Sequence, residues 1–292
     1  MDYIYYVKNL LRHVTSSSLR TKVKRVKRHL KQILSKEKKN SLDDFRYLLE
    51  HNLGIKKGDW LLVSSSFGNL NADFTPRQAI ELLQSIVTEE GLIMMPYYPP
   101  MNSTEWANHG YVFDMLETKS GMGVLTNVFS EMPNVYKSIH PTKAVCCWGA
   151  CVGNVLKIDQ HINSTTPFYW DSPYGELLKH DSKSLCLGLK NIPIIHAIED
   201  VLSDHYDAYY YPTKKKLKIR LADRSEIEAE TYVHNPTILD RCVPPGDYVR
   251  NINPHSYLRV PFGLKYVVVV DNKDLFYAVK QQFIKGNTRF CE

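Results

Sequence analysis

The sequence lacks the features that mark several protein classes. It has no apolar run approaching the ~18 residues that a membrane-spanning helix needs. Only 14 glycines and 15 prolines occur among 292 residues, which excludes a collagen-like chain and does not fit wholesale disorder. The first residues show no positively charged segment followed by an apolar one, so we expect no secretory signal.

Cysteine is too sparse and too irregularly spaced for a disulfide-dense or zinc-stabilised fold. The six cysteines include no Cys-x-x-Cys pair, and no histidine follows them at zinc-finger spacing. Cys146, Cys147 and Cys186 lie in apolar runs and are predicted to be core residues. We therefore expect no metal site and a reduced, cytoplasmic protein.

Common nucleotide-binding and hydrolase motifs are also missing. Gly121-Met122-Gly123 begins like a dinucleotide fingerprint, but Thr126 stands where the third glycine would be. The sequence has no phosphate-binding loop, no Gly-x-Ser-x-Gly around Ser65, no His-Glu-x-x-His and no pyrophosphate loop of the common small acetyltransferases. A nicotinamide cofactor is therefore poorly supported.

The net charge of +6 is unevenly distributed. Residues 1–40 contain twelve Lys or Arg and two acidic residues, a net +10, so residues 41–292 carry a net −4. Apolar residues recur at helical spacing in residues 1–40, which predicts a basic amphipathic helical extension. One interpretation is that this extension packs on the body or on a partner subunit of a homo-oligomer. The other is that it contacts the inner face of the cytoplasmic membrane. No nucleic-acid-binding motif accompanies the charge, so we expect no nucleic-acid partner.

Residues 41–292 are predicted to form one large α/β domain. Ser41 is the expected N-cap of a helix that runs towards His51. Apolar strands are expected at 60–63, 91–95, 144–148, 184–187 and 266–270, and helices at 76–86, 123–129, 191–204 and 275–283. This alternation predicts a three-layer α/β/α architecture with a mainly parallel central sheet. Alternating residues at 217–221 and 226–232 predict a β-hairpin elaboration.

Seven motifs resemble, in the same order, those of the aminoglycoside 3-N-acetyltransferase family, which has the antibiotic N-acetyltransferase fold. They are 53–59 running into 62–67, the strand 91–96, Met122 to Thr126, Ser138 to Thr142 leading to Trp148-Gly149, Ser172 to Gly175, the strand that ends at Gly188, and His196-Ala197-Ile198-Glu199. The resemblance covers residues 41–285. Ser64 departs from the pattern, because the family typically has a histidine there, whereas Ser65 and Ser66 match.

The resemblance implies an acetyl-CoA-dependent N-acetyltransferase that acts on the amino group of an amino sugar. Its expected acetyl-CoA contacts are Ser64, Ser65, Ser66, Phe67, Gly123, Val124, His140, Pro141 and Thr142. The serines follow the carboxyl end of a strand, where open α/β sheets bind ligands, and their hydroxyl and N–H groups suit a pantetheine arm or a thioester oxygen. For His140, a buried core histidine with satisfied hydrogen bonds remains an equal alternative.

His196 and Glu199 are the predicted catalytic residues. They lie three apart on a predicted helix, so both side chains project from one face. A carboxylate beside an imidazole fixes its tautomer and raises its basicity. An ordinary exposed helical pair is the alternative for any His-x-x-Glu. The resemblance implies instead that His196 is the general base and Glu199 the residue that orients it.

Tyr97, Tyr98 and Trp170 are the predicted substrate-binding residues. Aromatic side chains in loops at an edge of the sheet suit the face of a sugar, although core packing explains them as well.

Two acceptor classes compete. A polycationic aminoglycoside requires an acidic pocket, whereas an anionic nucleotide-linked amino sugar requires lysines. We favour the nucleotide-linked sugar, because a basic extension suits O-antigen or capsule synthesis near the inner membrane. The aminoglycoside of antibiotic resistance is the alternative, and a non-catalytic binding module is a third interpretation. The lysine run 214–216 is expected to be a solvated turn.

Overall fold

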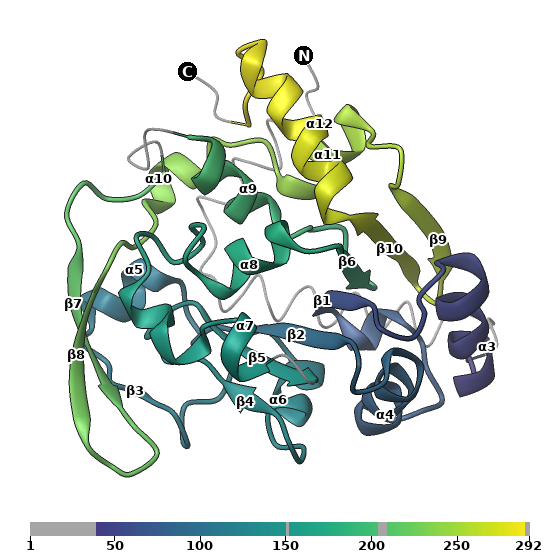
Figure 1. The fold of residues 1–292 in the computed structure, drawn as a ribbon, viewed down its shortest axis with the longest axis horizontal. Coiled ribbons are helices and arrows are strands. Elements are labelled where there is room, and N and C mark those ends of the chain that lie inside the picture. The colour runs from purple at the N-terminus through teal and green to yellow at the C-terminus, as the bar shows by residue number, and fades with distance from the viewer. Residues whose placement is uncertain (1–38, 150–151, 204–208, 290–292) are drawn as a thin grey trace. The chain divides into compact units, whose positions relative to one another are not determined.

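The computed structural model describes residues 39–149, 152–203 and 209–289 (Figure 1). The predicted basic helix of residues 1–40 lies outside these residues except for its last two positions, so its role stays a prediction. Within the described ranges, no helix is both long enough and apolar enough to span a membrane.

A seven-stranded sheet forms the centre of the described body, in the order β4-β5-β2-β1-β6-β10-β9. Its strands are β1 Trp60–Ser65, β2 Leu92–Tyr97, β4 Tyr136–Lys137, β5 Ala144–Gly149, β6 Ser182–Leu187, β9 Leu258–Phe262 and β10 Lys265–Asp271. β1 pairs in parallel with β2 and with β6, and the outer neighbours pair antiparallel. The predicted α/β class is confirmed, and parallel pairing is confined to the three central strands.

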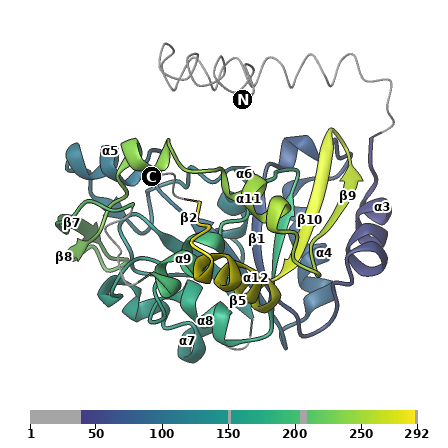
Figure 2. The same ribbon diagram turned by 90° about the horizontal axis from the view of Figure 1, so that it is seen from above.

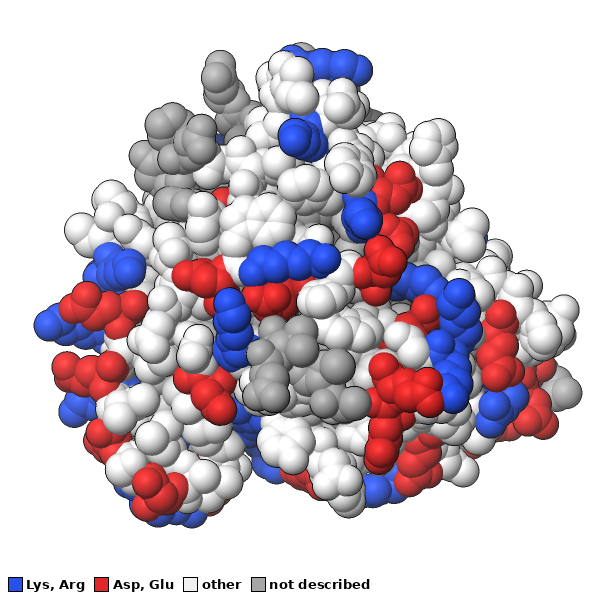
Figure 3. Space-filling model, viewed as in Figure 1, with Lys and Arg blue, Asp and Glu red and all other residues white. Residues whose placement is uncertain are grey.

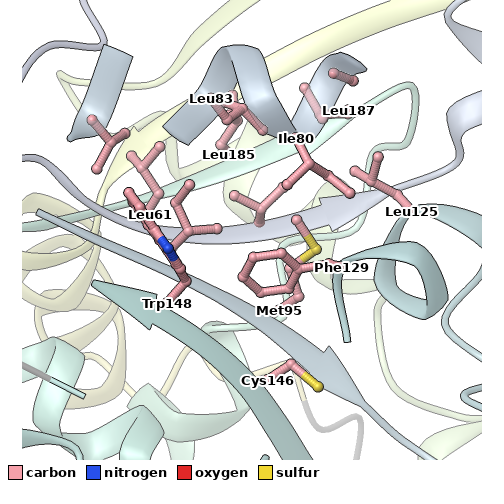
Figure 4. Close-up of a cluster of buried hydrophobic side chains, with 14 of the residues drawn as sticks. Leu61, Ile80, Leu83, Met95, Leu125, Phe129, Cys146, Trp148, Leu185 and Leu187 are labelled. Atoms are coloured by element: carbon pink, nitrogen blue, oxygen red, sulfur yellow. The ribbon is translucent and has the colours of Figure 1, made fainter. Parts of the chain in front are cut away.

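Strand β1 shows why the sheet is covered on both faces. Leu61 and Val63 belong to one buried cluster and Leu62 to another. Successive side chains of a strand point to opposite faces, so an uninterrupted apolar run requires a cover on each side. Figure 4 shows the first cluster, in which side chains of α4 and α6 meet those of the strands.

Helices supply both covers. One face is covered by α3 Leu42–Tyr47 with its π-helical continuation Leu48–Asn52, by α4 Pro76–Val87 and by α6 Val124–Phe129. The other is covered by α8 Pro173–Lys179, α9 Ile195–Leu202, α11 Pro245–Ile252 and α12 Asn272–Ile284, of which α8, α9 and α12 lie together (Figure 2). The remaining helical segments are α5 Ser103–Asn108, α7 Val152–Val155, α10 Pro236–Leu239 and the 3-10 turns Phe67–Asn69 and Ile158–Asn163.

Local capping fixes where the early helices begin. Ser41 is the N-cap of α3, as predicted, and forms a reciprocal capping box with Asp44. Thr75 and Gln78 form the same arrangement at α4, directly before Pro76.

The predicted hairpin is confirmed as β7 Lys215–Arg220 and β8 Glu226–Thr231. A short strand, β3 Phe113–Asp114, joins it in parallel to form a separate three-stranded sheet at the side of the body (Figure 1). Asp114 accepts hydrogen bonds from Arg220 and Arg224, both at 3.3 Å. The chain leaves β8 into α10, on the way to the pocket described below.

The side chain of Asn272 joins α12 to strand β6. It is buried, its Nδ2 donates to Ser182 Oγ at 2.8 Å, and its Oδ1 accepts from Ser184 Oγ at 2.7 Å. Asn272→Ala leaves the buried Ser184 hydroxyl without an acceptor, so we expect the free energy of unfolding to fall by about 2–3 kcal/mol in urea titrations. Exposed Gln281→Ala on the same helix is the matched control. Equal stability of the two variants would contradict the prediction.

Candidate active site

A pocket of about 240 Å³ opens beside α9. It is lined by Tyr98, Asn102, Ser103, Lys143, Phe168, His196, His234, Pro236 and Leu239. Neighbouring strands position two of these residues: Tyr97 of β2 pairs with Ala144 of β5, so Tyr98 and Lys143 lie one residue beyond the pair at the same edge of the sheet. The pocket therefore has a rigid wall of paired strands on one side and helix α9 on another.

His196 reaches the pocket from α9. Its side chain is 23% exposed, whereas the Glu199 side chain on the same side of the helix is fully buried. His196 Nδ1 lies 3.7 Å from Glu199 Oε2, too far for a hydrogen bond, and Nδ1 has no hydrogen-bond partner. The spacing of the two residues places them as predicted, but the expected direct hydrogen bond is absent.

Glu199 is held instead by Arg289. Arg289 Nε lies 2.5 Å from Glu199 Oε1, and its Nη2 donates to Oε2 at 2.8 Å, so the pair is bidentate and buried. The guanidinium also donates to the Val243 carbonyl oxygen at 2.8 Å. Burial raises the pKa of Glu199, and the positive charge of Arg289 opposes that rise. This correction gives Glu199 a different primary partner, one that the sequence did not reveal.

The environment of His196 favours a neutral imidazole. Burial lowers the pKa of His196 well below the usual 6.5, and the positive charges of Arg289 and Lys143 lower it further. At neutral pH the ring is therefore unprotonated, which is the form that accepts a proton.

A second histidine, which the sequence analysis missed, lines the same pocket. The rings of His234 and His196 have centroids 5.7 Å apart, and His234 Nε2 is buried without a hydrogen-bond partner. The His234 ring stacks on Tyr210 at 4.7 Å, and the Tyr210 hydroxyl donates to Asp200 Oδ2 at 3.1 Å. In the sequence, the only indication of a role for His234 was its position just after the predicted hairpin.

The structure favours the core alternative for His140. The residue is 1% exposed, and its Nδ1 accepts from the backbone N–H of Thr142 at 3.2 Å and of Lys143 at 2.9 Å. Its Nε2 must then carry the proton and donate to Thr231 Oγ1, 3.2 Å away. His140, Pro141 and Thr142 are all buried outside the pocket lining, where the hydrogen bonds of His140 fix the turn that carries Lys143; their contacts with acetyl-CoA stay predictions.

His161 holds Phe168 in a similar way. Its Nε2 donates to the Pro167 carbonyl oxygen at 2.9 Å, so its Nδ1 accepts from Ser138 Oγ at 2.9 Å. The Ser138 hydroxyl in turn accepts from the N–H of Val145 at 2.9 Å. This chain of hydrogen bonds ties the loop before Phe168 to strand β5.

The serine turn lies at the end of β1 and outside the pocket lining. Ser64 Oγ is buried without a hydrogen-bond partner, and Ser66 Oγ accepts from Asn69 Nδ2 at 2.9 Å. Gly123, at φ 109°, precedes Val124 at the start of α6 and faces the Ser65 carbonyl oxygen. The structure thus brings the Ser65 and Gly123 segments together, and their role in acetyl-CoA binding stays a prediction.

Phe67, also a predicted acetyl-CoA contact, has an edge-on contact with Phe74 at 6.0 Å. It packs against the buried cluster on the α4 face of the sheet.

Only one of the three predicted substrate-binding aromatics lines the pocket. Tyr98 does so, and its hydroxyl bonds with that of Tyr174 at 2.8 Å. Tyr97 points to the opposite face of the sheet because it is the preceding residue of a strand, and its hydroxyl donates to the Thr118 carbonyl oxygen at 2.6 Å. Trp170 packs near Phe276, with ring centroids 5.9 Å apart. Both residues pack against neighbouring side chains outside the pocket lining, and their contact with substrate stays a prediction.

The buried cysteines agree with the sequence analysis. Cys146, Cys147 and Cys186 are buried, unbridged core residues. Among the residues that the structure describes, no group of three His, Cys, Asp or Glu side chains gathers as metal ligands.

Comparison with known proteins identifies the family. The model of the family described as aminoglycoside 3-N-acetyltransferase matches residues 62–283. The chain belongs to this family. A curated relative, the SPbeta prophage-derived aminoglycoside N(3')-acetyltransferase-like protein YokD of Bacillus subtilis, is 30% identical over 158 residues, which are 47% of this chain. The chain spans only 56% of that relative's length in this match.

Solved structures show that this chain shares its fold with YokD and with aminoglycoside acetyltransferases. The crystal structure of YokD matches with a TM-score of 0.68 at 20% identity, covering 89% of this chain and 99% of that one. A mutant of aminoglycoside acetyltransferase AAC(3)-IVa in complex with a gentamicin matches with a TM-score of 0.66 at 19% identity, covering 88% of this chain and 94% of that one. AAC-IIIb in a binary complex with CoASH matches with a TM-score of 0.62 at 16% identity, covering 85% of this chain and 98% of that one.

The Glu199–Arg289 pair predicts a specific stability pattern. Arg289→Met leaves a buried carboxylate without its partner, and we expect it to lower the free energy of unfolding by about 3–5 kcal/mol. The double variant Glu199→Leu with Arg289→Met removes both charges and should be less destabilised than the single variant. Urea titrations of the three proteins measure this. A double variant at least as unstable as the single one would contradict the prediction.

The buried histidines predict acid sensitivity. Burial lowers the pKa of His161 from 6.5 to about 4, and lowers those of His140, His196 and His234 well below 6.5. The unfolded chain therefore binds protons that the native state does not, so stability is complete above pH 6.5 and falls as the pH drops below it. The lowered pKa of His161 alone corresponds to about 3 kcal/mol once the pH is below its folded value.

Urea titrations from about pH 7.5 to about pH 5 test this dependence. His161→Gln should flatten the loss of stability with decreasing pH. An unchanged slope in that variant would mean that His161 does not contribute.

Proposed function

We propose that the protein transfers the acetyl group of acetyl-CoA to an amino group of an amino sugar. The observation that carries the proposal is the neutral, partly exposed imidazole of His196 in the pocket of a chain from this family. A small-molecule pocket with one accessible base and hydrogen-bonding side chains suits amide formation.

The reaction needs little more than a base and a fixed geometry. The neutral amine attacks the carbonyl carbon of the thioester, forming the N–C bond, and the C–S bond then breaks with coenzyme A leaving as a thiolate. His196 accepts the proton lost by the nitrogen and passes it to the thiolate sulfur. Glu199 Oε2 lies 3.7 Å from His196 Nδ1 with its charge balanced by Arg289, so the base acts without a direct carboxylate partner.

Acetyl-CoA is the donor that the family implies, and the CoASH complex of AAC-IIIb supports it. The chain offers a place for the arm of this substrate at the end of β1. There the buried Ser64 hydroxyl has no partner, and the side of Gly123 where a Cβ would project is open apart from the Ser65 carbonyl oxygen.

The names of the relatives bear on the acceptor. YokD is called aminoglycoside acetyltransferase-like, and AAC(3)-IVa was solved with a gentamicin. These names support an aminoglycoside acceptor better than the nucleotide-linked amino sugar that the sequence analysis favours. An acceptor screen should therefore include gentamicin, kanamycin and nucleotide-linked amino sugars, with release of the coenzyme A thiol as the readout.

His196→Ala tests the mechanism. Loss of a general base lowers turnover by about 100-fold or more, so we expect at least that loss of kcat with any acceptor that the wild-type protein acetylates. His51→Ala, which removes an exposed histidine on the opposite face of the sheet, should keep full activity. Unfolding curves of both variants show whether the fold is intact. Unchanged turnover in a folded His196→Ala protein would overturn the mechanism.

A further inference from the structure

The charge inside the pocket is positive. Of the nine lining residues, Lys143 is the one that is cationic at neutral pH, because burial lowers its pKa only to about 8; two are histidines, and none is Asp or Glu. Both histidines have their pKa lowered by burial, so they are neutral at pH 7 and Lys143 sets the sign.

Lys143 is held firmly but has no anionic partner among the described residues. Its Nζ lies 4.4 Å from the ring centroid of Tyr98 and 5.8 Å from that of Phe168. Its backbone N–H donates to His140, which fixes the turn. Among the described residues, Lys143 Nζ forms no ion pair and no side-chain hydrogen bond. Lys183, by contrast, forms both with Asp59.

The two carboxylates on the neighbouring helix are already engaged. Glu199 is paired with Arg289 through both oxygens. Asp200 accepts hydrogen bonds from the hydroxyls of Thr166 and Tyr210 through one oxygen, and burial raises its pKa well above the usual value. Neither is among the residues that line the pocket. Among the described residues that line the pocket, a polycation would therefore meet Lys143 without a compensating acid.

We propose that the acceptor amine belongs to a molecule that also carries an anionic group, a carboxylate or a phosphate, and that Lys143 binds this group beside His196. This inference rests on the proposed acetyl transfer, and it departs from the polycationic acceptor that the names of the relatives support. Basic and acidic side chains are interspersed over the face shown in Figure 3, so selection by charge arises inside the pocket rather than from a one-sign surface patch on that face.

Two other anions could occupy Lys143; the geometry argues against the first, and the comparison of acceptors below distinguishes the second. The phosphates of acetyl-CoA are separated from its thioester by the pantetheine arm, whereas Lys143 and His196 share one pocket of about 240 Å³. A thioester at His196 therefore places the phosphates elsewhere. The oxyanion of the tetrahedral intermediate is common to every acceptor, so a lysine that bound it would not distinguish acceptors by charge.

Matched acceptors and matched lysine variants test the proposal. The probes are glucosamine, glucosamine 6-phosphate, an aminohexuronic acid and kanamycin. Lys143→Met should lower kcat/KM for the phosphate or carboxylate acceptor by about tenfold or more, mostly through KM, and change that for glucosamine by less than about twofold. Lys143→Arg, which keeps the charge, should retain most of the activity, and KM for acetyl-CoA should be unchanged.

Lys137→Met is the control. Lys137 lies 4.0 Å from the ring centroid of the neighbouring Tyr97 and donates to the Met115 carbonyl oxygen at 2.6 Å, but it does not line the pocket. It should behave as wild type with every acceptor. This control separates the loss of the pocket charge from the loss of a lysine packed on a tyrosine.

Three outcomes would overturn the proposal: an equal loss of activity of Lys143→Met with charged and uncharged acceptors, a rise of KM for acetyl-CoA alone, or a wild-type preference for kanamycin. In each of them acetyl transfer itself still holds. Calorimetry of the anionic probes without acetyl-CoA separates the two proposals. If the wild-type protein binds an anionic probe and Lys143→Met does not, the anion site is supported even in a protein without acetyl transfer. If the wild-type protein binds none of the anionic probes, the anion site is refuted.

Discussion

The buried ion pair between Glu199 and Arg289 is the interaction on which the pocket depends. It cancels the one carboxylate that lies next to His196, and it places a guanidinium close enough to lower the pKa of that histidine. Burying an ion pair costs desolvation energy that its own attraction only partly returns, so the pair is better explained by what it does to the site than by stability. The resulting pocket holds one lysine among its described lining residues and a neutral, partly exposed histidine.

The alternation of side chains along two strands gives the pocket its second wall. Tyr97 and Tyr98 are adjacent in sequence but point to opposite faces of the sheet, one to the core and one to the pocket. Lysines accompany both tyrosines: Lys137 lies over Tyr97 and Lys143 over Tyr98. The same type of contact therefore serves packing on one face of the sheet and ligand recognition on the other.

The fold could be largely predicted from the sequence because its signals are local. Short apolar runs, the cap at Ser41 and the alternation of residues 217–221 all depend on neighbours within a few positions. His196 was found because its spacing to Glu199 is also local. The partner of Glu199 is 90 residues away along the chain, and no local pattern indicates it.

The features that the sequence left open also depend on distant parts of the chain. Whether His140 faces a ligand or the core is decided by Thr231, which is 91 residues away. The lysine run 214–216 drew attention as a basic feature, yet within the run Lys216 pairs with Glu230 at 3.5 Å on the exposed hairpin. The lysine that matters for the pocket is isolated in sequence, so only the folded chain shows that it lacks an acidic partner.

The distance between Glu199 and Arg289 along the chain also has a consequence for synthesis on the ribosome. Helix α9 emerges 90 residues before the arginine that neutralises its carboxylate. During that interval Glu199 has to stay hydrated or take up a proton, so α9 cannot settle against the sheet in its final form. His196 is carried by the same helix, so a nascent chain that stops before residue 289 lacks the charge balance of the finished pocket.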